Sequence, residues 1–476
     1  MTTATKITIN PITRLEGHGK VTIHLDGSGE VDEAFFHITQ FRGFEHLCQG
    51  RPIEEMPIIT QRICGICPVS HQLTAAKACD AICGVKIPET AALLRELLHM
   101  GQFIQSHALH FFHLASPDLL LGWDSDPAKR NVVGLLEAAP ELVKKGIRLR
   151  KFGQEIISAL GGKKIHPVFA VPGGVTHALP QTARDKLRIG FEEAFQTAQS
   201  ALTIIQDWVG QHLPEVHGFA NFPSHYASLV DDQGRIQLYE GDLRIKSHAG
   251  ATLAQFKPDA YLDYIAEHVE PWSYMKFPFF KPQGYPDGAY RVGPLARLHA
   301  ADAMGTPHAD AAFTVFRQLA SNGIKGASLL YHYARMIELL YGLEKAQALL
   351  EDDRICGRTF RTTTAPVNAE GVGMIEAPRG TLIHHYGVDE HGMVNKVNLI
   401  VATGHNNIGM NRAVALVAKA HIHKGVVSEG MLNRVEGAIR CYDPCLSCAT
   451  HALGQMQLII AVRDVTGRCI TQLERT

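Results

Sequence analysis

Two cysteine pairs near opposite ends of the chain restrict its fold more than any other feature of the sequence. The first pair is Cys64 and Cys67, and the second is Cys445 and Cys448. At this spacing both thiolates of a pair can bind one metal ion, and two pairs offer four soft, electron-rich ligands. If the pairs share one site, the fold has to bring together segments that are hundreds of residues apart.

The overall composition is that of an ordinary globular protein. The chain has 476 residues, of which 46% are hydrophobic and 20% charged, with a net charge of -1. This balance does not indicate nucleic acid or an anionic membrane as a partner. Residues 1–10 lack the apolar stretch of a secretory signal, and no apolar run approaches the ~20 residues of a membrane span. We therefore expect a cytoplasmic protein, in which paired cysteines are more often metal ligands than disulfides.

Apolar periodicity predicts a mainly α protein with a small β component. Alternation of apolar and polar residues indicates strands over 5–40 and again over 370–404. Apolar residues at helical spacing predict helices from Pro88 onward and over 178–214, 309–321, 327–352 and 407–424. The expected fold is a long helical bundle plus one small sheet built from the two strand regions. Both cysteine pairs are expected in turns beside helices.

Three kinds of metal site are compatible with four cysteines. A structural zinc ribbon usually separates its pairs by about 15–20 residues, and a domain of this size has little need of a metal staple. An iron–sulfur cluster often takes several ligands from one compact run of sequence. A catalytic transition metal with open positions is the third alternative, and it also accounts for the residues that flank the pairs. The spacing alone does not identify the metal.

Several segments resemble the large subunit of nickel–iron hydrogenases, and the resemblance covers essentially the whole chain. The segments are RLEGHG at 14–19, RGFE at 42–45, QSH at 105–107, PGGV at 172–175 and EAPRG at 376–380. Three others, at 272–278, 290–295 and 445–451, are most similar to the bidirectional, NAD-reducing cytoplasmic branch. The resemblance implies the large-subunit fold, with residues 1–451 as a single catalytic domain.

The resemblance implies unequal roles for the four cysteines. All four would bind nickel, with Cys64 and Cys445 as terminal ligands. Cys67 and Cys448 would also bridge the nickel to an iron that carries CO and cyanide ligands. Anionic thiolates are suited to this, because they stabilise the higher oxidation states of nickel.

The resemblance also implies roles for residues around the metals. Glu16 would hydrogen-bond a terminal cysteine and relay protons, as a carboxylate can if burial raises its pKa. Arg379 would reach the diatomic ligands, and the Thr403 hydroxyl would be a second donor to cyanide. Asp118 and Asp443 would hold Arg379 in place, because an unpaired buried charge is costly.

A second ion and one histidine complete the implied site. Glu45, His451 and the backbone carbonyl of Leu399 would bind magnesium or a similar ion. Magnesium prefers oxygen ligands, so the histidine in this set rests on the resemblance. His71 would orient a bridging sulfur, although a helix-capping or core histidine is an equally simple alternative.

The implied function is that of the catalytic subunit of a reversible hydrogenase. H2 would be split heterolytically, and its proton would pass to the terminal thiolate of Cys445 and then to Glu16. The chain has no further ligand set for clusters and no GxGxxG fingerprint after a strand, so NAD+ would be reduced elsewhere. The implied partners are a small Fe–S subunit and diaphorase subunits with flavin and NAD.

The resemblance implies proteolytic maturation as well. Residues 452–476 would be a C-terminal extension, which a dedicated endopeptidase removes after His451 once nickel is in place. Nickel-insertion chaperones are implied as further partners. Removal of the extension would let the loop that carries Cys445 and Cys448 close over the metal.

Two other classes of protein remain as alternatives. A complex-I-like core subunit shares the fold but has no nickel, and such subunits lack the cysteine pairs. A zinc-stapled assembly protein would contain zinc and neither nickel nor iron, so metal analysis distinguishes it.

Overall fold

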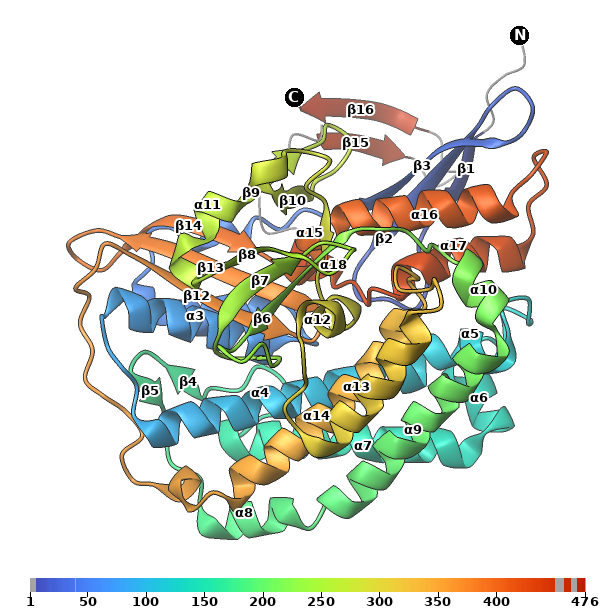
Figure 1. The fold of residues 1–476 in the computed structure, drawn as a ribbon. Helices are drawn as coiled ribbons and strands as arrows, with labels where there is room; N and C mark the ends of the chain where they lie inside the picture. The colour runs from blue at the N-terminus through green and yellow to red at the C-terminus, as the bar shows by residue number, and fades with distance from the viewer. Residues whose placement is uncertain (1–5, 39, 450–457, 464–468, 476) are drawn as a thin grey trace.

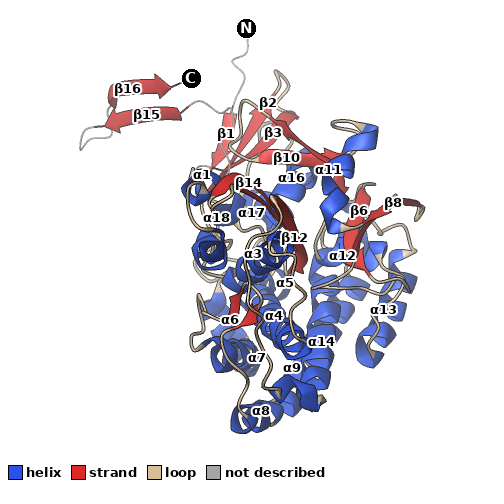
Figure 2. Ribbon diagram, turned by 90° about the vertical axis from the view of Figure 1, so that its left-hand side faces the viewer, coloured by secondary structure: helices blue, strands red, loops and turns tan. Residues whose placement is uncertain are grey.

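Long helices form the body of the protein, and small sheets lie against one side of it (Figures 1 and 2). The structure, a computed structural model, describes residues 6–38, 40–449, 458–463 and 469–475, with side chains through 449. The helices α4 (Glu89–Leu109), α7 (Pro140–Gly161), α9 (Phe191–Gln211) and α14 (Leu330–Glu351) make up most of the body. Every residue of α14 from Leu330 to Leu343 is buried, whereas α7 and α9 bury one apolar stripe each.

The remaining helices are shorter than these four. They are α1 (Phe44–Cys48), α2 (Met56–Thr60), α3 (Pro68–Ile82), α5 (Ser116–Leu121), α6 (Val132–Ala138), α8 (Gln181–Arg188), α10 (Leu213–Gly218), α11 (Tyr261–Tyr264), α12 (Pro294–Ala300), α13 (Pro307–Ala320), α15 (Ala402–His405), α16 (Asn407–His421), α17 (Glu429–Arg440) and α18 (Leu446–Ala449). The predicted helices over 309–321, 327–352 and 407–424 are confirmed as α13, α14 and α16. The helix predicted over 178–214 is divided into α8 and α9, with Gly190 at the break.

The strands form separate small sheets, so the prediction of one sheet was wrong. The N-terminal strands β1 (Lys6–Ile9), β2 (Gly19–Leu25) and β3 (Val31–Ile38) pair in that order, antiparallel. The strands β12 (Glu370–Ala377), β13 (Gly380–Val388) and β14 (Val394–Ile400) form a second antiparallel meander. Short connections close each meander on itself, and the two then pack on different helices, β3 against α16 and β12 against α3.

A third sheet was not predicted. It has the order β11-β6-β7-β8, formed by β6 (His225–Val230), β7 (Asp242–Lys246), β8 (Thr252–Phe256) and β11 (Tyr290–Arg291). The pairs β4 (Ala170–Val171) with β5 (Gly174–Val175), β9 (Ile265–Val269) with β10 (Lys276–Phe280), and β15 (Leu458–Arg463) with β16 (Cys469–Arg475) complete the strands.

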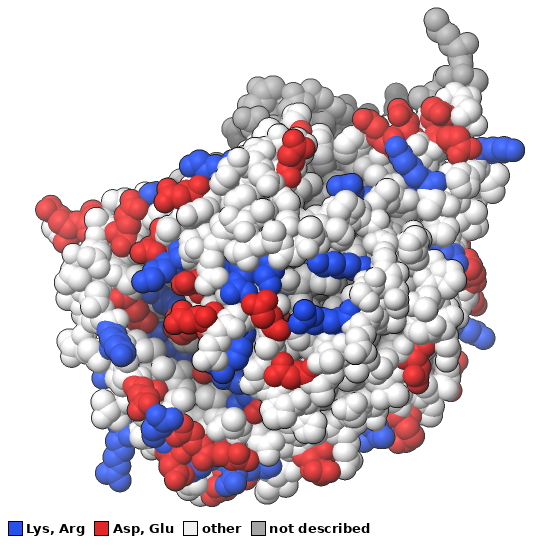
Figure 3. Space-filling model, viewed as in Figure 1, with Lys and Arg blue, Asp and Glu red and all other residues white. Residues whose placement is uncertain are grey.

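Charge and hydropathy at the surface agree with the balanced composition. Acidic and basic side chains are interspersed over the face seen in Figure 3. Among the helices that the structure describes, none is both long enough and apolar enough to cross a membrane.

The contact between β12 and α3 joins the two walls of the region that holds the cysteines. Helix α3 begins directly after Cys67, and β12 ends two residues before Arg379. Two glycines allow the strand to touch the helix backbone. A Cβ atom on Gly373 would lie 2.0 Å from the Thr74 carbonyl oxygen, and one on Gly371 would lie 2.5 Å from that of Ala78. Backbone, unlike a flexible side chain, has little freedom to move away.

We expect Gly373→Ala to reduce the free energy of unfolding by about 1–3 kcal/mol, because the added methyl group forces β12 away from α3. Gly210→Ala is the matched control, since Gly210 is exposed on α9 and a Cβ there meets nothing within 4 Å. It should stabilise the protein by about 0.5–1 kcal/mol through helix propensity. Denaturant unfolding of both variants measures the difference, and equal effects would contradict the proposed packing role of Gly373.

Candidate metal centre

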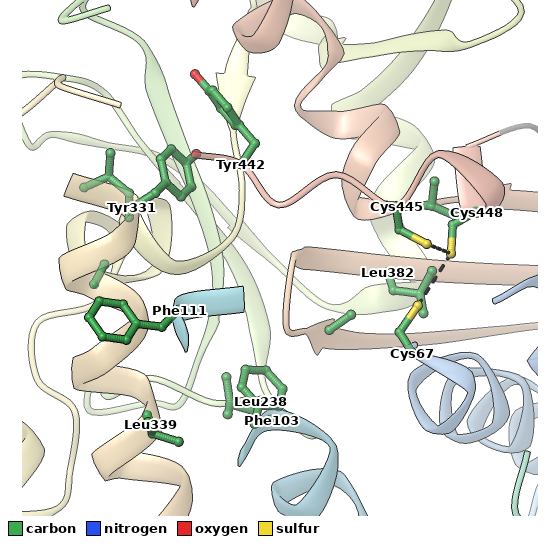
Figure 4. Close-up of a cluster of buried hydrophobic side chains, with 14 of the residues drawn as sticks. Cys67, Phe103, Phe111, Leu238, Tyr331, Leu339, Leu382, Tyr442, Cys445 and Cys448 are labelled. Atoms are coloured by element: carbon green, nitrogen blue, oxygen red, sulfur yellow. Dashed lines mark hydrogen bonds between the residues drawn. The ribbon is translucent and has the colours of Figure 1, made fainter. Parts of the chain in front are cut away.

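The fold brings the sulfur atoms of both cysteine pairs together in one buried cluster, and Figure 4 shows Cys67, Cys445 and Cys448 of this cluster. The four sulfur atoms lie within 4.8 Å of one another, and all four residues are buried. The sulfur of Cys64 is 3.1 Å from that of Cys445, and the sulfur of Cys67 is 3.5 Å from that of Cys448. Within the second pair the two sulfurs are 2.9 Å apart. None of the described cysteine side chains forms a disulfide.

Turns and backbone hydrogen bonds position the cysteine side chains of both pairs. The amides of Ile66 and Cys67 both donate to the Cys64 sulfur, at 3.2 Å each, within the turn that precedes α3. Before the second pair, Asp443 has a φ of 52°, in the left-handed region that non-glycine residues seldom occupy. This turn directs Cys445 back into the protein, and its amide donates to the Thr403 hydroxyl at 2.9 Å.

The electrostatics of the cluster favour a bound cation. Burial raises the pKa of Cys445 and Cys448 well above the usual thiol value. Burial also opposes ionisation of Cys64, but hydrogen bonds from the other sulfurs outweigh it and hold the pKa of Cys64 well below its usual range. One thiolate is thus shared among neighbouring thiols. A metal ion would allow all four to ionise, because cysteine binds metals as thiolate, so the donor set fits nickel and iron.

An unpaired buried nitrogen supports the same fit. A small cavity beside the sulfurs is lined by Cys67, Cys448, Arg379, Thr403 and apolar residues that include Leu382. The Arg379 side chain is 4% exposed, and its Nη1 atom has no hydrogen-bond partner among the described residues. Leaving such a donor unsatisfied costs about 1–3 kcal/mol. An acceptor in the cavity would remove this cost.

Arg379 is held by Asp443, as predicted from the sequence. Its Nε donates to the Asp443 carbonyl oxygen at 2.6 Å, and its Nη2 donates to the Asp443 carboxylate at 3.2 Å. His110, at the start of a π-helical turn (His110–Ala115), places Nδ1 3.0 Å from the same carboxylate. Burial opposes ionisation of Asp443, but the charge of Arg379 and the contact with His110 hold its pKa well below the usual range.

Asp118 does not contact Arg379, which corrects the prediction made from the sequence. Its Oδ1 accepts from Arg14 at 2.5 Å, and its Oδ2 accepts from Arg440. Asn433 donates to Oδ1 as well, at 3.0 Å. The reason is that α5, α17 and the N-terminal segment meet here, and the carboxylate pairs with the buried guanidinium group of Arg440 and the partly buried one of Arg14.

Glu16 lies directly beside the second cysteine pair, where the sequence predicted it. The Cys445 thiol donates to Glu16 Oε2 at 3.1 Å, and the Ser447 amide donates to the same oxygen at 3.0 Å. The Ser447 hydroxyl donates to Oε1 at 2.5 Å. Backbone contact fixes the register, because the Leu446 amide donates to the Glu16 carbonyl at 3.1 Å. Sequence reasoning missed Ser447, although its position between two predicted ligands was a usable signal.

His71 contacts a sulfur of the second pair and begins a chain of buried side chains. Its Nε2 lies 3.3 Å from the Cys448 sulfur, and its Nδ1 lies 3.1 Å from His384 Nε2. His384 Nδ1 in turn lies 2.7 Å from the Tyr386 hydroxyl. His384 and Tyr386 were not predicted, because they lie on β13 and only the sheet brings them to α3.

Two of the three residues predicted to bind a magnesium ion are adjacent. Glu45, on α1, accepts a hydrogen bond at 2.8 Å from the amide of Leu399, on β14. The carboxylate and the backbone of this strand are therefore in contact. The third residue, His451, lies outside the described residues.

The chain matches known family models and curated relatives over most of its length. The model described as nickel-dependent hydrogenase matches residues 42–124 and 224–451, and one described as HoxL-like matches 6–41. The chain is 44% identical to the NAD-reducing hydrogenase HoxS subunit beta of Cupriavidus necator, over 99% of each chain. It is 29% identical to the sulfhydrogenase 2 subunit alpha of Pyrococcus furiosus, over 94% of this chain and 98% of that one.

A solved structure is similar over nearly the same span. It is that of an NAD+-reducing [NiFe]-hydrogenase in the H2-reduced state, with a TM-score of 0.92 and 48% identity. The match covers 94% of this chain and 100% of the other.

We expect Asp118→Asn to lower the free energy of unfolding by about 3–5 kcal/mol, because it leaves the buried Arg440 and the partly buried Arg14 with a weakened partner. Asp124→Asn is the matched control, since Asp124 is 69% exposed and pairs with Arg434 at the surface. Its effect should stay below about 1 kcal/mol. Denaturant unfolding compares the two, and equal losses would contradict the role assigned to Asp118.

Proposed function

This chain belongs to the nickel-dependent hydrogenase family, and from this premise we propose that it is the catalytic subunit of a reversible, NAD+-linked nickel–iron hydrogenase. One observation carries the proposal from fold to chemistry. Four buried sulfurs share one site, and the unpaired Nη1 of Arg379 belongs to a residue that lines the cavity beside them. A nickel-free complex-I-like subunit would need neither the sulfur set nor this donor. A zinc-stapled assembly protein would use the four sulfurs, but it would need no cavity with a free donor beside them.

The four cysteines would hold both metals. Cys64 and Cys445 are proposed as terminal nickel ligands, and Cys67 and Cys448 as bridges to iron. The walls of the cavity suit an iron that carries CO and cyanide, because Arg379 can donate to an acceptor such as cyanide. The Thr403 hydroxyl, which accepts from the Cys445 amide, keeps its own hydrogen for the same purpose. When bound, the metal pair supplies the Lewis-acid and redox chemistry of heterolytic H2 cleavage.

The protein residues beside Cys445 handle the proton. The Cys445 sulfur is the base that receives it, and Glu16 Oε2 lies within hydrogen-bond distance, at 3.1 Å. Ser447 holds the carboxylate in this position through both its amide and its hydroxyl. Glu16 is partly exposed, so a proton on its carboxylate can leave toward the surface. His71 and Asp443 act as positioning residues for Cys448 and Arg379.

A magnesium ion is proposed as a structural neighbour of the second cysteine pair. Glu45, the Leu399 carbonyl and His451 would bind it, with water completing an octahedral set. The contact between Glu45 and the Leu399 amide supports this, because it holds a carboxylate against the same strand.

The electron acceptor is proposed to be NAD+, reached through partner subunits. The support is the similarity to a HoxS beta subunit and to a solved NAD+-reducing hydrogenase. The similar sulfhydrogenase 2 subunit alpha of Pyrococcus furiosus is named for a different activity. We therefore propose that the partner subunits, and not this chain, set the electron acceptor. A small Fe–S subunit and diaphorase subunits with flavin and NAD would carry the electrons. Such an assembly works where NAD+ is available, so we propose the cytoplasm.

The C-terminal segment is proposed to be a maturation extension. Residues 1–451 would be the mature catalytic domain, and an endopeptidase would remove 452–476 after nickel-insertion chaperones have delivered the metal. In both Figure 1 and Figure 2 the hairpin of β15 and β16 lies outside the helical body, beside the N-terminal sheet, which supports an accessory role.

We expect Cys445→Ser to lose most of its nickel, because a hydroxyl is a much poorer ligand than a thiolate for this soft site. Cys356→Ser is the matched control, since its partly exposed thiol is not part of the cluster. Elemental analysis of purified protein should show wild-type nickel and iron in the control only. Size-exclusion elution and thermal unfolding check that both variants are folded. Wild-type nickel in folded Cys445→Ser protein would refute the ligand assignment.

We expect Glu16→Gln to slow H2-dependent NAD+ reduction and H/D exchange by about 10²–10⁴-fold, with both metals retained, because glutamine cannot accept the proton. Glu390→Gln is the control, since that side chain is 87% exposed. Normal exchange in Glu16→Gln would refute its proton role. If the wild-type complex exchanges H/D but does not reduce NAD+, the acceptor is wrong and the hydrogenase assignment stands.

A further inference from the structure

A second cavity lies away from the metal centre, between the start of β6, strand β11 and helix α16. Its volume is about 380 Å³, and no residue that lines it also lines the metal cavity. One part of its wall is apolar, with Phe222, Pro286 and Ile408, and another part is polar, with His225, His248 and Arg412. This volume and mixed lining are typical of sites for small organic ligands.

A fully buried arginine in the wall has no carboxylate partner. Arg291 is 0% exposed, and its donors go to neutral oxygens. Nε donates to the Ser224 hydroxyl at 2.7 Å, and Nη1 to the Gly326 carbonyl at 2.9 Å. Nη2 donates to the Phe222 carbonyl and the Tyr226 hydroxyl, both at 3.1 Å. No ion pair involves Arg291 in the described part of the chain, so its charge is not neutralised.

A second guanidinium group faces the same ring. Arg291 lies 4.5 Å from the centroid of Phe222, and Arg412, on α16, lies 4.9 Å from it. The Arg412 side chain is exposed, and within the described ranges it forms no ion pair. The two guanidinium groups repel each other, and an anion between or beside them would offset this repulsion.

Lys325 adds to the positive potential around the cavity, and two histidines respond to this potential. Lys325 donates to the His248 carbonyl at 2.7 Å. Burial lowers the pKa of His248, and the charges of Lys325 and Arg291 lower it further. The pKa of His299 is well below its usual value for the same reasons. Asp287 is the one carboxylate among the residues of the cavity wall that the structure describes.

We propose that this cavity binds a small organic phosphate. A phosphate dianion would neutralise the charge of Arg291 and accept hydrogen bonds from Arg412 and His248, because guanidinium groups match phosphate oxygens well. The apolar part of the wall, with Phe222, Pro286 and Ile408, would receive the organic body of the ligand. A free phosphate ion would leave this part of the wall without a contact.

The test is isothermal titration calorimetry of the purified full-length protein at constant ionic strength. The probes are adenosine 5′-monophosphate, inorganic phosphate and adenosine. We expect saturable binding of the nucleotide at one site, and clearly weaker binding of phosphate and of adenosine. No saturable binding of the nucleotide would overturn the proposal. Adenosine binding as tightly as the nucleotide would also overturn it, because the phosphate would then contribute nothing.

Two arginine variants locate the site. Arg412→Gln should weaken nucleotide binding by about tenfold or more, the effect of losing one strong charged contact. Arg188→Gln is the matched control, because Arg188 is an exposed arginine on α8, outside the cavity. Its binding should equal that of the wild type. Equal losses in both variants would indicate non-specific charge attraction and overturn the proposal. Inorganic phosphate binding as tightly as the nucleotide would refute the role of the apolar wall.

Discussion

Four sulfur atoms within 4.8 Å of one another form the contact on which the rest of this structure depends. Buried thiolates this close repel one another, so without a metal the cluster keeps most of its protons. The fold can hold the arrangement because each pair is fixed by its own backbone. The first pair is held by the turn that starts α3, and the second by the left-handed turn at Asp443 and by the Thr403 hydroxyl.

Two separate groups of ion-paired side chains lie near this cluster. The first, Arg379 with Asp443, lies directly at the sulfurs and leaves one Arg379 nitrogen for a ligand in the cavity. The second, Asp118 with Arg14 and Arg440, joins the N-terminal segment to α5 and α17. The second group is structural, yet it matters for the site, because it anchors the segment that carries Glu16 beside Cys445. Loss of the Asp118 carboxylate would leave the buried charge of Arg440 uncompensated, which is costly.

Membership of the nickel-dependent hydrogenase family and the geometry of the cluster together account for where H2 chemistry takes place in this chain. The residues proposed to be catalytic lie where segments from both ends of the sequence meet, as Glu16 and Cys445 do. The organic-phosphate site, by contrast, is built from β6, β11 and α16, and its wall shares no residue with the metal cavity. The two sites can therefore be tested by independent variants.

Short segments of the sequence determined the features of this protein that depend on residues close together in the chain. The cysteine spacing was enough to predict a four-sulfur metal site, and the resemblance of the segments with Glu16 and Arg379 to a known family predicted that these residues lie beside it. Apolar periodicity was enough to predict α13, α14 and α16. These features depend on residues that are close in sequence, so their pattern is visible without the fold.

Only the tertiary structure decided which distant side chains meet. Asp118 pairs with Arg14 and Arg440 and not with Arg379, because three segments converge on it. The two strand regions form separate meanders because each packs on a different helix. His384 reaches His71 through the contact of a sheet with α3, and Arg291 and Arg412 share one ring although far apart in sequence. The sequence determined the chemistry of each residue, but the burial and pairing of charges depend on packing between elements, which no local pattern encodes.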